Sequence, residues 1–180
     1  MARNIEIKAV CQDRAALQSR IETLAGTPTA ELQQDDSFFV CASGRLKLRD
    51  FGNGHGELIA YERPDTPEPS LSSYTRSVTD DPAGLRATLT RALGCWVRVI
   101  KTRTLYMAGR TRIHLDRVDG LGDFVELEVV LDAQEEPVDG RREAERLMAQ
   151  LGIEARDLCV NAYADMLRPA QTPPSYWNRL

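Results

Sequence analysis

Alternation of polar and apolar residues predicts that this chain is rich in β-strands. Between residues 4 and 10, Ile5 and Ile7 alternate with Glu6 and Lys8. Successive side chains of a strand point to opposite faces, so this segment has one apolar and one charged face. The other segments with strand character are residues 37–41, 45–51, 57–64, 73–78, 96–107, 110–117 and 123–131, which brings the predicted number of strands to eight.

Apolar residues at helical spacing predict helices between and after the strands. Asp13 can cap a first helix, and Gly26 lies just past its end. We expect this helix to be amphipathic and to cover a sheet. A second helix is expected between Asp81 and Gly94. Two further helices are expected over residues 141–151 and 156–167, before an irregular tail over residues 169–180.

Charged residues fall on one face of several of these strands. One face of the strand over residues 110–117 carries Arg110, Arg112, His114 and Asp116. One face of the strand over residues 123–131 carries Glu126 and Glu128. Two structures account for this pattern. An antiparallel sheet has one wet face, on which mixed charges are ordinary. Alternatively, the strands close into a barrel whose charged interior faces a ligand.

Composition narrows the class of protein. The chain has 180 residues, of which 42% are hydrophobic, and a formal net charge of -4. We therefore expect one globular domain over residues 1–180. No apolar run approaches membrane-spanning length and residues 1–8 are charged, so we expect a cytoplasmic protein that does not enter a membrane. The acidic balance argues against nonspecific nucleic-acid binding.

Any metal site is expected to use carboxylates. The four cysteines are isolated from one another, without a CxxC pair, which makes a zinc site a poor interpretation. His55 and His114 are the only histidines, too few and too far apart for a histidine-based site. Carboxylate ligands favour Mg²⁺ or Mn²⁺.

The charges on the strand faces predict an anionic ligand if they share one interior. The cations are Lys8, Arg45, Lys47, Arg49, Lys101, Arg103, Arg110 and Arg112, and the carboxylates are Glu6, Asp116, Glu126 and Glu128. Eight cations against four carboxylates leave four uncompensated positive charges. Burying them without a ligand or water costs several kcal/mol for each unpaired ion. A triphosphate, with roughly four negative charges, bound together with a divalent cation fits this mixture.

Several motifs resemble those of the CYTH superfamily, the triphosphate tunnel metalloenzymes. They are Glu6-Ile-Lys8, Lys101 and Arg103 before an aromatic residue, Asp116, and Gly120-Leu-Gly-Asp-Phe-Val-Glu126-Leu-Glu128. The resemblance extends over residues 3–168, including the closing Tyr163-Ala-Asp-Met-Leu167, and is strongest to the class IV adenylate cyclase-like branch. It implies an α+β fold in which an eight-stranded antiparallel barrel, flanked by helices, binds a nucleoside triphosphate or inorganic triphosphate with Mg²⁺ or Mn²⁺.

The resemblance also implies roles for individual residues. The implied metal ligands are Glu6, Asp116, Glu126 and Glu128, with Asp116 either as a ligand or as an acceptor for a metal-bound water. The implied substrate-binding residues are Lys8, Arg45, Lys47, Arg49, Arg76, Lys101, Arg103, Arg110 and Arg112. The implied catalytic residues are Glu6, Lys8, Lys101 and Glu126.

This chain departs from the family pattern at two positions. Asn4 stands where the opening motif has its first glutamate, so metal affinity is expected to fall. Glu62 stands where relatives often carry a phosphate-binding lysine, so either Arg63 substitutes for it or one phosphate contact is missing.

Three functions follow from the resemblance and stay open at this point. The first is an adenylate cyclase that converts ATP to cyclic AMP and pyrophosphate. The second is a triphosphatase that hydrolyses inorganic triphosphate or a nucleoside or thiamine triphosphate. The third is a noncatalytic sensor of polyphosphate or nucleotide. In each case the partner is a small triphosphate-containing molecule, and a homodimer is left open.

Overall fold

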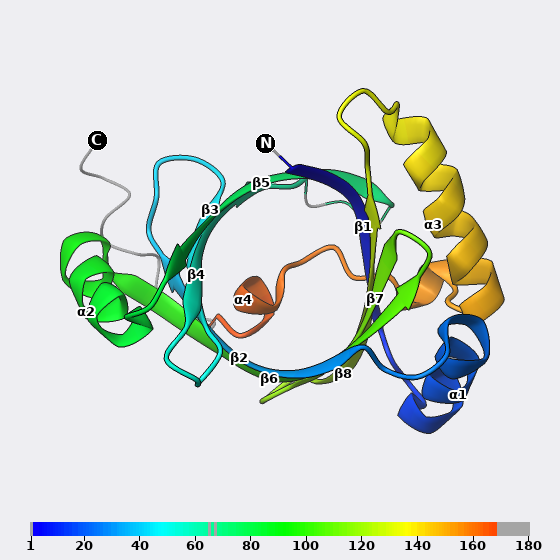
Figure 1. The fold of residues 1–180 in the computed structure, drawn as a ribbon, viewed down its shortest axis with the longest axis horizontal. Helices are drawn as coiled ribbons and strands as arrows, with labels where there is room; N and C mark the ends of the chain where they lie inside the picture. The colour runs from blue at the N-terminus through cyan, green and yellow to red at the C-terminus, as the bar shows by residue number, and fades with distance from the viewer. Residues whose placement is uncertain (1, 65, 67, 169–180) are drawn as a thin grey trace.

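The eight predicted strands form one closed antiparallel barrel (Figure 1). The computed structural model describes residues 2–64, 66 and 68–168. The strands are β1 (Ala2–Val10), β2 (Ala30–Phe39), β3 (Arg45–Asp50), β4 (Gly56–Glu62), β5 (Ser70–Thr79), β6 (Cys95–Ala108), β7 (Thr111–Val118) and β8 (Gly122–Val130). Around the barrel they follow the order β1-β5-β4-β3-β2-β6-β7-β8. Pairing of β1 with both β5 and β8 closes the ring.

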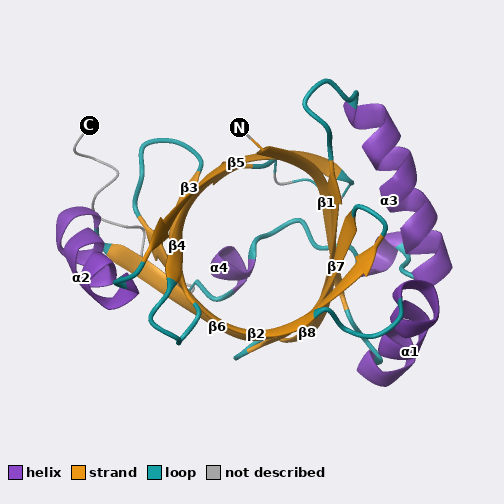
Figure 2. Ribbon diagram, in the orientation of Figure 1, coloured by secondary structure: helices purple, strands orange, loops and turns teal. Residues whose placement is uncertain are grey.

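Helices lie outside the barrel, except for a short one at its end. These are α1 (Arg14–Ala25), α2 (Pro82–Leu93), α3 (Pro137–Leu151) and α4 (Tyr163–Met166). In Figure 2, α1 and α3 pack beside each other on one flank, α2 lies on the opposite flank, and α4 is seen within the ring. Asp13 and Asp81 cap the first two helices through their carboxylates, which accept from the backbone N–H groups of Ala16 and Gly84.

The main apolar core lies between the barrel wall and α1 and α3. Ile7 on β1, Ile113 on β7 and Leu127 on β8 point outward and pack with Ile21 of α1 and Leu147 of α3. The apolar face predicted for each of these strands is therefore the outer one. Because side chains alternate along a strand, the charged faces of the same strands point into the barrel.

A second apolar cluster closes one end of the barrel. Phe38, Val99 and Phe124 come from three different strands and pack against Tyr163 of α4. The Tyr163 hydroxyl donates a hydrogen bond to Asp116 Oδ2 at 3.1 Å. The short helix is thus held by both apolar packing and a buried polar contact, and it blocks this end.

Two predicted elements differ from the observed ones. The helix expected over residues 156–167 is wrong: residues 155–157 form a 3-10 turn, Leu158 bridges to Ala9, and only α4 is helical. The chain is extended here because Leu158 pairs with Ala9, near the end of β1, before the chain crosses the end of the barrel. The strand expected over residues 37–41 begins at Ala30 instead. Residues 33–37 are five polar residues in succession, so no hydrophobic alternation reveals this part of the strand.

The part of the chain that the structure describes contains no helix long and apolar enough to cross a membrane. The predicted tail over residues 169–180, including Tyr176 and Trp177, lies outside the described residues.

Gly140 tests how tightly α3 packs on the barrel. A Cβ atom at this position would lie 2.6 Å from Leu131 Cδ2 and 2.8 Å from Ile5 Cγ1, both closer than real contacts allow. Alanine in a helix interior is favoured over glycine by about 1 kcal/mol, whereas overpacking a core costs about 1–3 kcal/mol. We expect Gly140→Ala to lower the free energy of unfolding in urea by about 1 kcal/mol. An increase in stability would contradict the packing described for α3.

Candidate functional site

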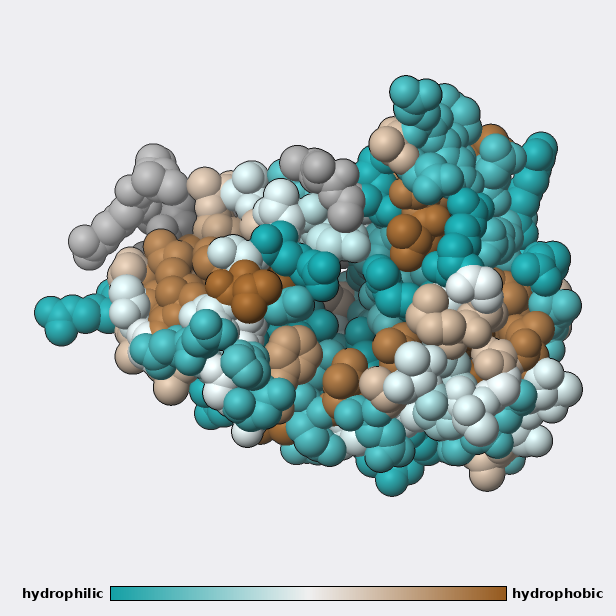
Figure 3. Space-filling view, viewed as in Figure 1, coloured by the Kyte–Doolittle hydropathy of each residue, from teal (hydrophilic) through white to brown (hydrophobic). Residues whose placement is uncertain are grey.

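The barrel encloses a cavity of about 300 Å³ to which all eight strands contribute side chains. The space-filling view down the barrel shows a hollow at the centre of this face, with hydrophilic residues at its rim (Figure 3). The cationic residues lining the cavity are Lys8, Lys47, Arg49, Arg63, Arg76, Lys101, Arg103 and Arg112. The carboxylates lining it are Glu6, Asp36, Glu57, Glu126 and Glu128.

Exposure changes steadily from one end of the cavity to the other. Next to the α4 plug, the side chains of Lys8 and Lys101 are only 5% and 3% exposed. At the other end, the side chains of Arg112 and Arg76 are 29% and 57% exposed. The cavity therefore has one closed end and one open mouth, and a ligand must enter past Arg76 and Arg112.

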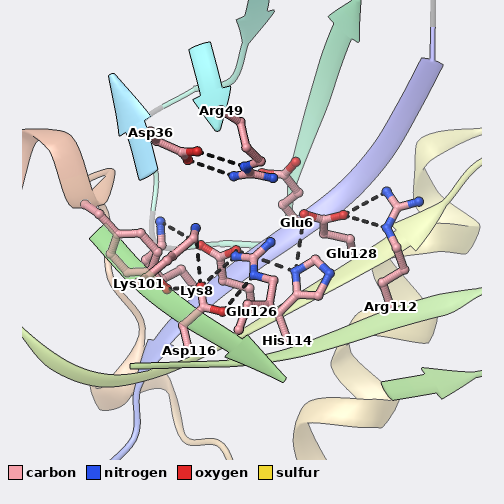
Figure 4. Close-up of polar contacts among 12 residues, drawn as sticks. Glu6, Lys8, Asp36, Arg49, Lys101, Arg112, His114, Asp116, Glu126 and Glu128 are labelled. Carbon is pink, nitrogen blue, oxygen red and sulfur yellow. Dashed lines mark hydrogen bonds and ion pairs between the residues drawn. The ribbon is translucent and has the colours of Figure 1, made fainter. Parts of the chain in front are cut away.

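Glu126 lies at the centre of the most buried charge cluster (Figure 4). Its carboxylate accepts from Lys8 Nζ at 3.0 Å and from Arg103 Nη2 at 2.5 Å. Burial acts to raise the pKa of Glu126, but the charges of Lys8 and Arg103 outweigh it and hold this pKa well below its usual value. Arg103 also binds both oxygens of Asp116, at 2.7 and 2.6 Å, which with Lys101 lowers the pKa of Asp116 to about 2 against the effect of burial.

Lys101 is a buried cation with little compensating charge. Its Nζ lies 3.5 Å from Asp116 Oδ2, which already binds Arg103, and 4.9 Å from the centre of the Tyr163 ring. Burial and the neighbouring Arg103 guanidinium lower the pKa of Lys101 to about 7. An anion bound beside it would favour its charged form.

Asp36 organises a second cluster on the facing wall and was missed by the sequence analysis. Its oxygens accept from Lys47 Nζ at 2.9 Å and from Arg49 at 2.8 and 2.7 Å. Burial opposes ionisation, yet Arg49 and Lys47 hold the pKa of Asp36 well below its usual value. Asp36 lies two residues before Phe38 on the same strand, so the two side chains point to the same, inward face. This alternation would have identified Asp36 as a cavity residue if β2 had been predicted to begin at Ala30.

His114, Glu126 and Glu128 form the group best placed to hold a metal ion among the described residues. One ligand atom from each lies within 4.8 Å of the others. His114 Nδ1 is 3.5 Å from Glu128 Oε1 and 3.7 Å from Glu126 Oε2. Burial and Arg103 lower the pKa of His114, which favours the neutral imidazole that binds metals. The structure therefore places a histidine beside the carboxylates that the sequence predicts as metal ligands.

Glu6 borders this group without belonging to it. It is the register partner of Glu128 across β1 and β8, and its carboxylate lies 3.5 Å from Arg63. Burial and the charge of Glu128 raise the pKa of Glu6. A cation bound between Glu6 and Glu128 would relieve this repulsion, so Glu6 fits a metal-facing position.

Three of the predicted site residues lie outside the cavity. Arg45 binds Asp165 at 2.9 Å in a separate surface hollow. Arg110 belongs to the turn after β6 and binds Glu135 and Glu143 on the outer surface, because the reversal of the chain interrupts the alternation expected from Arg112. Asp116 is fully buried behind Arg103 and does not line the cavity. The other predicted residues, Glu6, Lys8, Lys47, Arg49, Arg76, Lys101, Arg103, Arg112, Glu126 and Glu128, do line it.

The structure also places the two residues that depart from the family pattern. Asn4 lines the cavity and is 1% exposed. Glu62 points outward, away from the cavity, whereas the next residue, Arg63, points into it. The family pattern has a phosphate-binding lysine at the position of Glu62. In this chain the next residue, Arg63, places a cation in the cavity instead.

The charge balance of the interior is less extreme than predicted. Eight cations face the cavity, against five carboxylates that line it and Asp116 directly behind Arg103. The surplus is thus two positive charges rather than four. A mixed, partly buried set of this kind can bind a polyanion through the cations and a divalent cation through His114 and the carboxylates.

The fold and the site together define a closed β-barrel protein whose interior cavity is lined by cations and by a group of side chains that could hold a metal ion. Comparison with family models gives the more specific result. The model of the CYTH domain matches residues 2–163. The chain therefore belongs to the CYTH family.

Comparisons with individual proteins agree with this assignment. The adenylate cyclase CyaB of Aeromonas hydrophila is 25% identical, over 77% of this chain and 86% of that protein. The structure of PH1012 from Pyrococcus horikoshii OT3 matches with a TM-score of 0.80 and 22% identity, covering 90% of this chain and 98% of that one. The candidate adenylyl cyclase HpAC1 from Hippeastrum, described as having a dominant triphosphatase activity, matches with a TM-score of 0.62 and 18% identity, covering 92% and 93%. The solved structures support the fold.

Asp36→Asn tests the buried anion that holds Lys47 and Arg49. Removing one partner of a buried ion pair leaves an uncompensated charge, so we expect a loss of about 3 kcal/mol in the free energy of unfolding at pH 7. The pKa of Asp36 is depressed in the folded state, so its stabilisation is present above the unfolded pKa, near 4, and is lost as pH falls through the folded pKa. The difference between the two proteins should therefore narrow below about pH 4. A constant difference across pH 2–7 in urea unfolding would contradict this role.

Proposed function

We propose that this protein is a metal-dependent enzyme that acts on a triphosphate inside the barrel. The observation that carries the proposal is the surplus of cations around a cavity that is closed at one end. Three lysines of the cavity are nearly buried: Lys8, Lys47 and Lys101. Each of them pairs with a carboxylate that also binds a second cation. Phosphate oxygens would complete the partners of these cations.

The proposed orientation of the substrate follows from the shape of the cavity. The terminal phosphate would lie deepest, near Lys8 and Lys101, because the α4 plug stops further passage. The guanidinium groups of Arg49 and Arg103, already oriented by Asp36 and Asp116, would bind oxygens along the chain of phosphates. Orientation of these donors before binding reduces the entropy lost when the substrate binds.

A divalent cation, Mg²⁺ or Mn²⁺, would be held by the carboxylates of Glu126 and Glu128, with Glu6 and the His114 imidazole beside them. When bound, such a cation neutralises phosphate charge and lowers the pKa of an attacking hydroxyl or water. Arg112, which binds Glu128 near the mouth, would turn toward the phosphates when a divalent cation binds that carboxylate, whereas Arg103 would stay held by Asp116.

For the reaction we favour an adenylate cyclase. The ribose 3′-hydroxyl would attack the α-phosphorus, the bond from that phosphorus to its bridging oxygen would break, and pyrophosphate would leave. The similarity to CyaB supports this choice. Hydrolysis of a terminal phosphate is the alternative, supported by the triphosphatase activity described for a structural relative. Both reactions need the same set of cationic side chains around the phosphates.

Product analysis tests the proposed function. The purified protein is incubated with ATP or inorganic triphosphate, each with Mg²⁺ or Mn²⁺, and the products are separated. Cyclic AMP with pyrophosphate supports the cyclase, and orthophosphate supports the triphosphatase. No product from either substrate, despite measurable binding, would contradict an enzymatic role and favour a sensor.

Glu126→Gln tests the metal-binding group. The amide retains an oxygen for Lys8 but removes the charge that a divalent cation requires. We expect turnover to fall by roughly 100-fold or more, the order seen when a group that stabilises transition-state charge is lost. Glu57→Gln is the matched control: Glu57 also faces the cavity, but it lies at the mouth, bound to Arg76. Equal loss in both variants, or full activity in a folded Glu126→Gln protein, would contradict the assignment.

Asn4→Glu distinguishes an enzyme from a sensor weakened at its metal site. Asn4 lies two residues from Glu6 on the same inward face, and its Oδ1 has no hydrogen-bond partner among the described residues. An added carboxylate should tighten Mn²⁺ binding about tenfold, or about 1.4 kcal/mol, measured by calorimetry. If the protein is an enzyme, the wild type already converts the substrate to product. Turnover that appears only in Asn4→Glu would instead support the sensor.

A further inference from the structure

The open mouth of the cavity has an apolar side. Leu32 on β2, Leu105 on β6 and Phe51, directly after β3, line the same cavity as the charged residues. β2 is hydrogen-bonded to both β3 and β6, so the three residues lie on neighbouring strands. Leu32 is six residues before Phe38, which packs at the plugged end, and six residues of strand span roughly 20 Å. The apolar side therefore belongs to the mouth.

Gln34 is the next inward-facing residue after Leu32 on β2, one step deeper in the cavity, and it brings a side-chain oxygen that has no partner among the described residues. It lines the cavity and is 3% exposed, and its Oε1 accepts no hydrogen bond from the described residues. Asp35 pairs with Asp50, so Gln34 and Phe51 are the next neighbours across β2 and β3. Leaving a buried carbonyl oxygen unpaired costs about 1–3 kcal/mol, so its presence here calls for a donor from a ligand or from water.

We propose that Gln34, Phe51, Leu32 and Leu105 form a subsite for the base of a nucleoside triphosphate. The apolar side chains would contact the faces of the base, and Gln34 Oε1 would accept from an exocyclic amine at its edge. This inference rests on the proposed function and deepens it, because inorganic triphosphate has no group to place here. An aminopurine such as adenine fits both features.

The position of the subsite matches the proposed direction of the phosphates. Gln34 is the register partner of Lys101, and Leu32 is that of Arg103. The Lys101 side chain extends toward the plug, where its Nζ lies near Tyr163. A nucleotide with its base against β2 would therefore direct its phosphates away from the mouth and along the cations of β6.

Binding measurements with three ligands test the subsite. ATP, purine riboside triphosphate and tripolyphosphate are titrated in EDTA, which removes divalent cations and stops metal-dependent turnover. Purine riboside triphosphate has hydrogen in place of the 6-amino group and so cannot donate to Gln34. We expect the wild-type protein to bind ATP about tenfold more tightly than the deaminated analogue, the value of one neutral hydrogen bond.

The variant Gln34→Leu should bind ATP and the analogue equally and leave tripolyphosphate affinity unchanged. Gln33→Leu is the matched control, because Gln33 is the adjacent glutamine on the outer face of β2, bound to Thr102. It should behave like the wild type. Equal affinity of the wild type for ATP and the analogue, or the same preference in Gln34→Leu, would overturn the subsite. Failure of tripolyphosphate to bind, in EDTA and again with Mg²⁺ present, would instead overturn the proposed function.

Discussion

The structure depends on how a small barrel compensates charges that it removes from water. Transferring an ion into a protein interior costs several kcal/mol unless other charges and hydrogen bonds replace its hydration. Here Glu126, Asp116 and Asp36 each bind two cations, so a few carboxylates compensate most of the positive interior. The compensation is incomplete by two charges. An anionic ligand therefore contributes to the balance of the interior as well as being bound by it.

This charged interior determines where the apolar core can lie. Because the inner faces of the strands are polar, their apolar faces must be covered from outside, which α1 and α3 do around Ile21 and Leu147. Inside the barrel, the buried apolar cluster lies at the end occupied by Tyr163. The cavity is closed at this end and open at the other, and the side chains that line it are more exposed toward the open mouth. Its two ends therefore differ. In the proposed function, the same architecture would orient a substrate from base to terminal phosphate.

The sequence predicts the fold well because its signal is alternation. Eight strands, their charged faces and ten of the thirteen distinct site residues could be located from period-two patterning together with the family motifs. Alternation fails where a strand is polar on both faces, as over residues 33–37 of β2, which hid Gln34 and Asp36. It also fails at a chain reversal, which moved Arg110 to the outer surface. The segment before α4 is shaped by pairing with β1 and by packing across the barrel end, and neither leaves a local pattern.

The central claim is that the interior is built for a triphosphate, and ligand-induced stabilisation tests it most directly. The unfolding temperature is measured in EDTA with tripolyphosphate or orthophosphate, at equal ionic strength. A ligand at 100 times its Kd stabilises the folded state by about 2.7 kcal/mol, which corresponds to about 5–10 °C for a chain of this size. The account predicts such an increase with tripolyphosphate and a much smaller one with orthophosphate. Equal shifts with both anions would contradict it.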